Sequence, residues 1–475
     1  MILRYFALVL FPALFLLTEV KAQHQELNEK PSIWKRNNDT LNESGTLAEA
    51  FRKGHVHGHF RYFFSQTNNS GDLTDYHAHA GGGGLRYESG KFHGFHIGVS
   101  GFFIYNLGSS DLSIPDSSTM SLNRYELGLF DIENPHNGND IDRLEELYIA
   151  YSRNKSNLSF GKILINTPFI NLQDGRMRPS GVQGAWFELA EWENVRVEGG
   201  YLTHFSPRST TKWYRGGESI GIYPAGVDPS GAKSLYPGHV ESKGTALLGI
   251  HVKTSETISL QAWNFTIDNV LNSALIQADF ERKAGNTSFI SAAQFIRQDA
   301  FGNGGSDIDS LAYVQQGNEA MTFGVKAGLS HGQWLAEINY NRITAHGRYL
   351  FPREWGRDPF FTFMSRERNE GFGDVHATTA RIQWKQKNGM LKASLTGGYF
   401  SLPDVRNFAL NKYGMPSYFQ VNLDIRYSFT GILQGLEAQG LLVWKGKSGE
   451  VYDNDRYVIN KVDMSLINVV VNYRF

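Results

Sequence analysis

Apolar and polar residues alternate near the end of this chain, and no other feature constrains the fold as much. Over residues 462–475, one parity carries the apolar or aromatic side chains of Ile467, Val469, Val471, Tyr473 and Phe475. From residue 468 onward, the other parity is mostly polar. Because successive side chains of an extended strand point to opposite faces, this stretch predicts a β-strand with one apolar face and one mostly polar face.

The same alternation recurs along the chain, most clearly over residues 54–64, 319–331, 375–387 and 417–430. Between such segments, short turns alternate with longer polar loops that contain proline and glycine. Soluble β-sandwiches also alternate, but their apolar faces point inward, so alternation alone does not separate lipid from core. Short turns on one rim and long loops on the other are typical of outer-membrane barrels, whose short turns lie in the periplasm.

The pattern predicts an all-β fold, a transmembrane antiparallel β-barrel of about 18 strands with short periplasmic turns and long extracellular loops. The expected strands are 54–64, 79–89, 93–106, 142–153, 156–165, 182–190, 194–204, 245–254, 257–267, 272–283, 286–299, 319–331, 333–343, 375–387, 389–401, 417–430, 434–446 and 461–475. A barrel of roughly 16–18 strands encloses a water-filled lumen.

The amino-terminal residues predict export. Arg4 precedes an apolar run over 5–17 that is too short and wrongly flanked for a membrane-spanning helix, so residues 1–22 are expected to be a signal peptide. Residues 23–53 are polar and without pattern, and we expect a periplasmic leader there, followed by the barrel at 54–475. The chain has no cysteine, which excludes a lipid-anchor cysteine and a disulfide framework.

Composition is compatible with a membrane barrel and gives no sign of a nucleic-acid partner. The formal net charge is −1 and the mean hydropathy is −0.35. A closed sheet crosses a bilayer with modest overall hydropathy, because only alternate residues face lipid. A chain so close to neutral is not expected to bind nucleic acid.

Several short runs carry a resemblance to a known family. They are the stretch LEELYIAY at 144–151, then Leu158–Lys162, Pro168-Phe169, Arg178-Pro179 and Gly184. In this order they resemble the strand, turn, strand and constricting loop of the OprD-type outer-membrane porins. The resemblance implies a barrel that forms a mostly specific channel for small solutes, many of them with a carboxylate. Lys162 departs from the family, which usually has arginine there.

The aromatic ending adds a second resemblance. Phe475, with Tyr473 two places before it, resembles the sorting signal that the barrel-assembly machinery of Gram-negative bacteria reads. Together with the export signal, it predicts a place in the cell outer membrane, among lipid and lipopolysaccharide.

We therefore expect a monomeric porin that passes small hydrophilic solutes by diffusion and needs no cofactor. The sequence contains no nucleophile elbow, zinc-protease helix motif or phosphate-cradling loop, so no enzyme activity is expected. Two other interpretations remain open. One is an outer-membrane barrel enzyme of the protease or lipase type, and the other is a secreted soluble β-protein that binds polysaccharide.

Candidate residues of the pore constriction lie in two long loops. Between residues 166 and 181, the glycine at 175 permits a sharp bend among charged neighbours, and the loop 344–374 is rich in arginine, whose planar donors suit a carboxylate. The resemblance implies that both loops fold into the lumen. The alternative is an outer-rim position, where these arginines bind lipopolysaccharide phosphates. The expected constriction residues are Asp174, Arg176, Arg178, Arg353 and Arg357, with Arg348, Arg366 and Arg368 nearby.

Inward-facing charges form a further prediction. If the apolar parity faces lipid, a lumen charge row is expected from Arg61, Arg86, Lys326, Arg381 and Arg426. Rows of charge along a pore set its ion preference. A balanced polar lining without a directional field is the alternative.

Four histidines are weak candidates for a metal site or a pH-dependent charge. His55, His57 and His59 share one face of a predicted strand, and His96 could join them from the third strand. Neutral imidazoles on one face can bind a transition metal. Because no carboxylate or cysteine completes a ligand set with them, no metal site is expected.

Overall fold

The computed structural model describes residues 31–34, 41–173 and 175–475. The predicted signal peptide, part of the predicted leader and the candidate Asp174 lie outside the described residues. Within them, one antiparallel sheet holds nineteen strands. The two-residue strand β8 (Tyr214–Arg215) pairs with the end of β7, and the other eighteen strands form the barrel.

The strands of the barrel follow one another around the wall in chain order. They are β1 (His55–Asn69), β2 (Tyr76–Glu88), β3 (Phe95–Ser109), β4 (Ile141–Arg153), β5 (Ser156–Ile163), β6 (Gly181–Leu189), β7 (Val195–Ser206), β9 (Thr245–Lys253), β10 (Ile258–Ile267), β11 (Leu271–Ala284), β12 (Thr287–Ala300), β13 (Glu319–His331), β14 (Trp334–Ile343), β15 (Val375–Lys385), β16 (Leu391–Ser401), β17 (Tyr418–Ser428), β18 (Leu436–Lys447) and β19 (Met464–Arg474). The helices are α1 (Leu47–Arg52) and the one-turn elements η1 (Leu127–Leu129), η2 (Gly217–Ser219), η3 (Asp309–Leu311), η4 (Arg353–Trp355), η5 (Gly431–Leu433) and η6 (Asp455–Tyr457). None of these helices of the described residues is long and apolar enough to cross a membrane.

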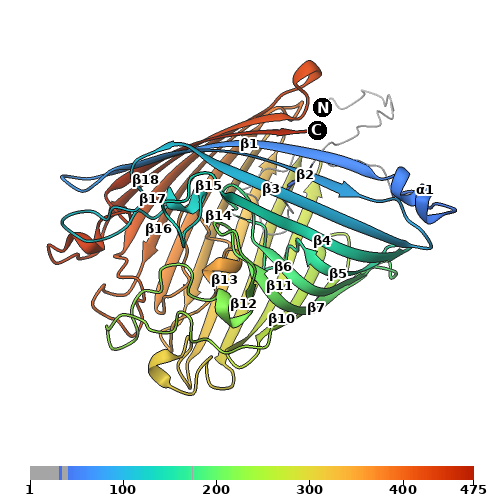
Figure 1. Cartoon of the computed structure of the whole chain (residues 1–475). Helices are drawn as coiled ribbons and strands as arrows, with labels where there is room; N and C mark the ends of the chain where they lie inside the picture. The colour runs from blue at the N-terminus through green and yellow to red at the C-terminus, as the bar shows by residue number, and fades with distance from the viewer. Residues whose placement is uncertain (1–30, 35–40, 174) are drawn as a thin grey trace, which may run out of the picture.

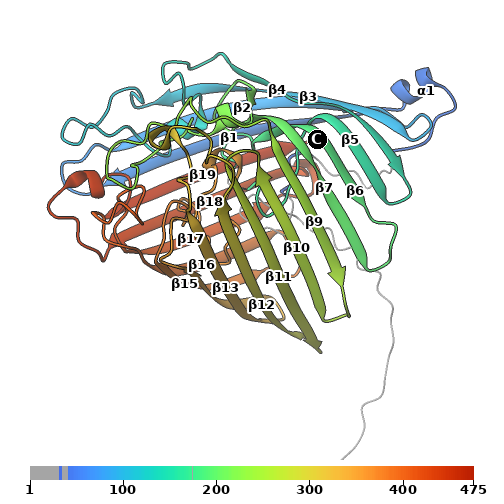
Figure 2. The same ribbon diagram turned by 90° about the horizontal axis from the view of Figure 1, so that it is seen from below.

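All eighteen predicted strands are confirmed, with ends that differ by no more than five residues. Short turns and α1 lie at one end of the barrel, whereas the long loops lie at the other end (Figures 1 and 2). This separation of turn lengths is the layout that the sequence predicts for an outer-membrane barrel.

The barrel closes where its first and last strands pair along their length. The terminal Phe475 continues this ladder, because its N–H donates to Gly58 O (3.1 Å) and its carbonyl accepts from Gly58 N–H (2.9 Å). The Phe475 ring lies over Gly58, with its centroid 5.8 Å from that of Phe60. A Cβ atom at position 58 would overlap the ring, so glycine provides the room that the last aromatic residue needs.

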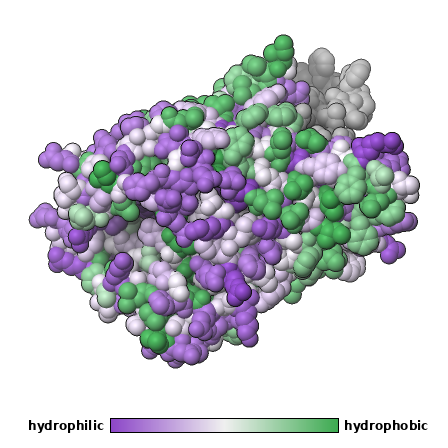
Figure 3. Space-filling model, in the orientation of Figure 1, coloured by the Kyte–Doolittle hydropathy of each residue, from purple (hydrophilic) through white to green (hydrophobic). Residues whose placement is uncertain are grey.

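Side-chain burial in the wall is the reverse of that in a soluble protein. On β17, Gln420 and Asn422 point inward and are buried, whereas Phe419 and Val421 are 47% and 39% exposed. Hydrophobic residues gather along the strand wall in Figure 3, and hydrophilic ones gather over the long-loop end. The apolar face of the sheet therefore faces lipid, which excludes the soluble polysaccharide-binding interpretation.

A hydrophobic core lies inside the barrel at the long-loop end. Phe169 stacks on Phe265 of β10, with ring centroids 4.8 Å apart, and Trp355 stacks on Phe205 of β7 at 3.9 Å. Each pair joins a loop residue to an inward-facing strand residue. Burial of these large rings fixes the loops against the inner wall.

We expect Phe475→Asp to lower the amount of folded barrel while secretion continues. The change removes the ring that packs over Gly58 and places a charge on the lipid face, which costs roughly 0–4 kcal/mol and least near the interface. The fraction of protein whose gel mobility changes on boiling measures folding. Ile432, fully exposed in a short turn, provides the control Ile432→Asp. Equal folded fractions for both variants would contradict this role of Phe475.

Candidate functional site

Two long loops leave the rim and fold into the barrel. They are the β5–β6 loop (164–180) and the β14–β15 loop (344–374), and most residues of both are buried. The Gln294 side chain on β12 donates to Pro359 O (3.1 Å), and Arg366 Nε donates to Asn468 Oδ1 on β19 (2.8 Å). Because β12 and β19 lie on different parts of the wall, the β14–β15 loop crosses the lumen.

The two loops meet inside the barrel at Asn171. The Asn171 side chain donates to Arg357 O (2.9 Å) and accepts from Arg357 N–H (3.1 Å). Nearby, the Ser180 hydroxyl donates to Glu354 O (2.6 Å). We call these two loops together the loop layer, and the loop layer is the candidate constriction.

Arg178 of the loop layer is held by charges and rings. Its guanidinium donates to both carboxylate oxygens of Glu145, from Nε at 2.8 Å and also from Nη2. Arg143 Nη2 donates to the same carboxylate at 2.9 Å. The guanidinium carbon of Arg178 lies 4.5 Å from the Phe102 ring centre and 4.7 Å from that of Trp34. Arg178 is 4% exposed and Glu145 is fully buried, so this bidentate ion pair is shielded from water.

A polar network continues from Arg178 to β1 and β19. Arg178 Nη1 donates to His59 Nδ1 (2.9 Å). An arginine cannot accept a hydrogen bond, so the other nitrogen of a neutral His59 ring is the donor, here to Asn472 Oδ1 (3.1 Å). Arg61 Nη1 donates to the same oxygen at 2.8 Å. The structure thus brings Arg61 and Arg178 into one cluster, which we call the Arg178 cluster.

A second cluster surrounds Glu367 of the β14–β15 loop. Its carboxylate lies 2.7 Å from Arg124 of the 110–140 loop and 2.9 Å from Lys445 of β18. Arg353 lies 3.8 Å from Glu367 and pairs more closely with Glu370, at 3.2 Å. Burial raises the pKa of Glu367, but the nearby cations outweigh burial and hold this pKa below its ordinary value. The ionised carboxylate therefore ties together two loops and the wall.

The other four residues of the predicted charge row have their side chains on the inward face of their strands. Each of them contacts a partner close to it. Each of them lies beside a carboxylate or an aromatic ring rather than in the Arg178 cluster. These contacts join Arg86 to Glu146 (3.3 Å), Lys326 to the Phe361 ring (5.1 Å), Arg381 to Glu337 (2.7 Å) and Arg426 to Asp424 (2.8 Å).

The described members of the predicted constriction all lie in the loop layer. Arg176 is buried with a positive φ of 44°, and the guanidinium carbon of Arg357 lies 4.2 Å from the Phe363 ring centre. Arg353 and Arg178 belong to the two clusters above. These inward positions do not fit the outer-rim alternative for the four arginines.

The four histidines are not assembled as one group. The rings of His55 and His57 lie 6.5 Å apart, His59 belongs to the Arg178 cluster, and His96 Nε2 lies 3.8 Å from Glu88. Among the residues that the structure describes, no three histidine, cysteine or acidic side chains are placed to hold a metal ion.

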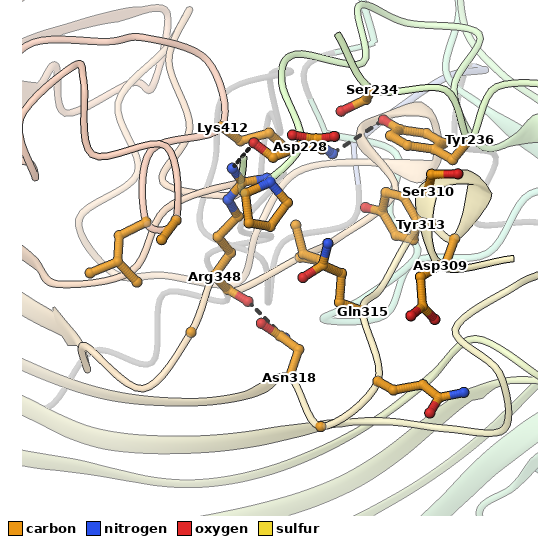
Figure 4. Close-up of a pocket in the computed structure, with 18 of the residues that line it drawn as sticks. Asp228, Ser234, Tyr236, Asp309, Ser310, Tyr313, Gln315, Asn318, Arg348 and Lys412 are labelled. Atoms are coloured by element: carbon orange, nitrogen blue, oxygen red, sulfur yellow. Dashed lines mark hydrogen bonds between the residues drawn. The ribbon is translucent and has the colours of Figure 1, made fainter. Parts of the chain in front are cut away.

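A cavity of about 450 Å³ opens among the long loops (Figure 4). Lys412 lies in its lining, where Nζ donates to Tyr236 Oη (3.1 Å) and lies 4.8 Å from the Tyr313 ring centre. Burial lowers the pKa of Lys412 to about 8, although the Glu370 carboxylate opposes this shift. The charge on this side chain therefore changes within a pH range that experiments can reach.

Arg348 joins four loops beside this cavity. Its guanidinium donates to the carbonyls of Val227 (2.8 Å), Asp228 (3.1 Å) and Phe408. Its own carbonyl accepts from the Asn318 side chain at 3.2 Å, as a dashed line in Figure 4 marks. These bonds fix the loops 207–244, 301–318 and 402–417 to the β14–β15 loop.

Sequence reasoning missed Glu145, Glu367, Lys412 and Trp34 as members of these groups. For Glu145 a signal was present in the sequence. Glu145 and Glu146 are adjacent, so strict alternation would place one of them on the lipid face, where a charge is costly. The pairing of β3 with β4 shifts register between Ser100 and Gly101, and this irregularity turns Glu145 inward beside its neighbour.

A closed barrel of eighteen strands, with an apolar exterior and a loop layer across a polar lumen, defines an outer-membrane β-barrel channel. Residues 123–357, nearly half of the chain, match the family model described as outer membrane porin, OprD family. The match confirms the predicted resemblance and, with the fold, the predicted porin function in the outer membrane. The matched family model and the fold are those of a channel rather than an enzyme.

Solved structures with a similar fold include porins of Pseudomonas aeruginosa and Acinetobacter baumannii. OpdK of Pseudomonas aeruginosa, solved with vanillate, has a TM-score of 0.69 at 13% identity, over 90% of this chain and 99% of that one. OccK9 (OpdG) of the same organism has a TM-score of 0.70 at 14% identity, with coverage of 90% and 99%. OccAB4 of Acinetobacter baumannii has a TM-score of 0.68 at 15% identity, with coverage of 89% and 98%. Comparison with curated protein sequences gives no significant match.

We expect Glu145→Ala to destabilise the barrel by roughly 3–5 kcal/mol, because it leaves the buried guanidinium groups of Arg143 and Arg178 without their shared carboxylate. Unfolding in urea with the protein in lipid vesicles measures the change in free energy. Glu256, whose side chain is 91% exposed and pairs with Lys253, offers the control Glu256→Ala, with an expected loss below about 1 kcal/mol. Similar losses for both variants would contradict the importance of the buried pair.

We expect the ratio of anion to cation permeability to fall as the pH rises through the Lys412 pKa of about 8. Lys412 is charged below this pH and neutral above it, so the cavity loses a positive charge. The reversal potential across a salt gradient measures the preference at each pH. Lys412→Met should weaken the pH dependence, and Lys412→Arg should move it to higher pH. Equal pH profiles for the parent and Lys412→Met would exclude Lys412 as the responsible group.

Proposed function

We propose that this porin passes small hydrophilic solutes by passive diffusion and favours small anions, including solutes with a carboxylate. The observation that carries the proposal is the approach of the loop layer to β1 and β19. Arg178 is linked to Arg61 through His59 and Asn472, and Arg366 bonds to Asn468 on β19. These guanidinium groups are bonded to protein partners, so their positive charge attracts anions through its field rather than by direct contact.

The balance of charge in this region supports the preference for anions. The guanidinium of Arg474 adds a further cation on β19, at 3.9 Å from the carboxylate of Glu437 on β18. Together with Arg61, Arg178 and Arg366, it makes arginine the commonest charged residue around the Arg178 cluster. A local excess of positive charge in a narrow passage raises the local concentration of anions.

The class of solute has a second line of support. OpdK, which shares the fold, was solved with vanillate, a small carboxylate. In the present chain, Lys412 lines the cavity among the long loops, and the charge of Arg178 acts on the passage from within the loop layer. We therefore propose small carboxylates as the first solutes to test.

Further proposals concern export and assembly. We propose that residues 1–22 are removed on export, that the chain acts as a monomer, and that lipopolysaccharide surrounds the outer rim. One chain closes the barrel by itself through β1 and β19, which supports a monomer. Phe475 is 41% exposed at the short-turn end, and we propose that the barrel-assembly machinery reads it there.

The double variant Arg176→Ala, Arg178→Ala should raise single-channel conductance and shift the reversal potential toward cations. It removes two bulky cations from the loop layer and leaves the Glu145 carboxylate with Arg143 alone. Planar bilayers with a salt gradient give both quantities. The control is Arg153→Ala, because Arg153 is exposed at the short turn after β4 and far from the loop layer. If conductance and reversal potential match the parent, the constriction lies elsewhere and the proposal fails.

A further inference from the structure

Two residues of the leader lie inside the barrel rather than outside it. Ile33 and Trp34 are each 7% exposed, and they pack against Leu172 of the β5–β6 loop. Further along, the leader is bound near the short-turn end where α1 lies (Figure 1), because Lys91 N–H donates to Asn42 O (2.9 Å) and Gly90 N–H donates to Ala50 O of α1 (2.9 Å). Described residues of the leader thus lie at two places, residues 33 and 34 at the loop layer and residue 42 at the periplasmic rim.

Trp34 contacts both the wall and the loop layer. Its indole N–H donates to Glu146 Oε2 on β4 (3.1 Å), and its ring meets the His59 ring of β1 edge-on, with centroids 6.3 Å apart. The same indole lies 4.7 Å from the guanidinium carbon of Arg178. An aromatic ring over a guanidinium is attracted to its charge and also covers one side of it.

Arg178 is enclosed by four side chains. Three of them, Glu145, His59 and Phe102, belong to strands of the barrel and are fixed by the hydrogen-bonded sheet. The fourth is Trp34, which belongs to no strand. Because Arg178 is 4% exposed, a solute in the lumen cannot reach its guanidinium while all four neighbours are in place.

We propose that Trp34 is a specificity-determining residue of the channel, supplied by the leader, which completes the constriction and shields Arg178 from solutes. This inference rests on the proposed role of Arg178 in anion preference. The indole occupies space at the level of the Arg178 cluster, so it narrows the passage. It also covers the cation, so it limits how strongly the passage attracts anions.

Bilayer recordings of three variants test the proposal. Trp34→Ala should raise conductance and shift the reversal potential further toward anions, because it exposes Arg178. Trp34→Phe keeps a ring near Arg178 and should stay close to the parent. In the variant Trp34→Ala, Arg178→Ala, the shift toward anions should disappear. The gel mobility change on boiling confirms that each variant folds, and Trp192→Ala, at a tryptophan that is 57% exposed in a short turn, is the matched control.

A chemical measurement tests the shielding directly. The chain has no cysteine, so Arg178→Cys introduces a single thiol. A negatively charged thiosulfonate reagent should modify this thiol faster when Trp34→Ala is added, because the ring that covers position 178 is then gone. Adding Trp192→Ala instead should leave the rate unchanged.

The outcomes separate this inference from the proposed function. If Trp34→Ala leaves conductance, reversal potential and thiol reactivity at parental values, while Arg176→Ala with Arg178→Ala changes the channel, the role of Trp34 is wrong and the proposed function stands. If neither Trp34→Ala nor Arg176→Ala with Arg178→Ala changes conductance or reversal potential, both this inference and the proposed function are wrong. A change of conductance in Trp34→Ala without faster thiol modification would also overturn the shielding.

Discussion

The pairing of β1 with β19 is the interaction on which the rest of this molecule depends. Lipid offers no hydrogen-bond partner, so an open edge would leave a row of backbone N–H and C=O groups unsatisfied. The pairing continues to the last residue, where Phe475 and Gly58 exchange two backbone hydrogen bonds. Closure also creates the lumen, which lets every strand turn its polar face away from lipid. The loop layer and its charges are possible only because this polar interior exists.

Ion pairs inside the lumen have two different roles. Around Glu367, the charges of Arg124 and Lys445 hold the β14–β15 loop against the wall, so they act as structural ties. Around Arg178, the Glu145 pair positions a guanidinium whose neighbours on β1 and β19 are also cationic. In the first arrangement every cation lies against a carboxylate, Glu367 or Glu370, whereas the second is the proposed source of a positive field in the passage. A porin needs both, because a loop that is not tied down cannot keep a charge at a fixed place.

The sequence was sufficient for the barrel because alternation is a local property. Strand number, loop lengths and the inward parity of Arg61 followed from the sequence pattern, and the structure confirms them. Strict alternation failed at Glu145. Here β4 holds one extra residue relative to β3, so the side chains of both Glu145 and Glu146 point into the barrel. The clusters of Glu367 and Lys412 join loops far apart in the chain, and no periodicity marks such contacts. For Trp34, an apolar pair within an otherwise polar leader was the one available sign.

Arg348 has a consequence for how the outer surface of this protein can vary. Its side chain is bonded to backbone carbonyls, not to side chains, so substitutions in the loops 207–244 and 402–417 leave the bonds intact as long as the backbone keeps its course. Insertions and deletions are different, because they move the carbonyls themselves. The outer mouth should therefore tolerate wide change in surface chemistry but little change in loop length. A graft that exchanges one loop for a longer one would disturb the other three, whereas the four loops exchanged together could be moved as a unit.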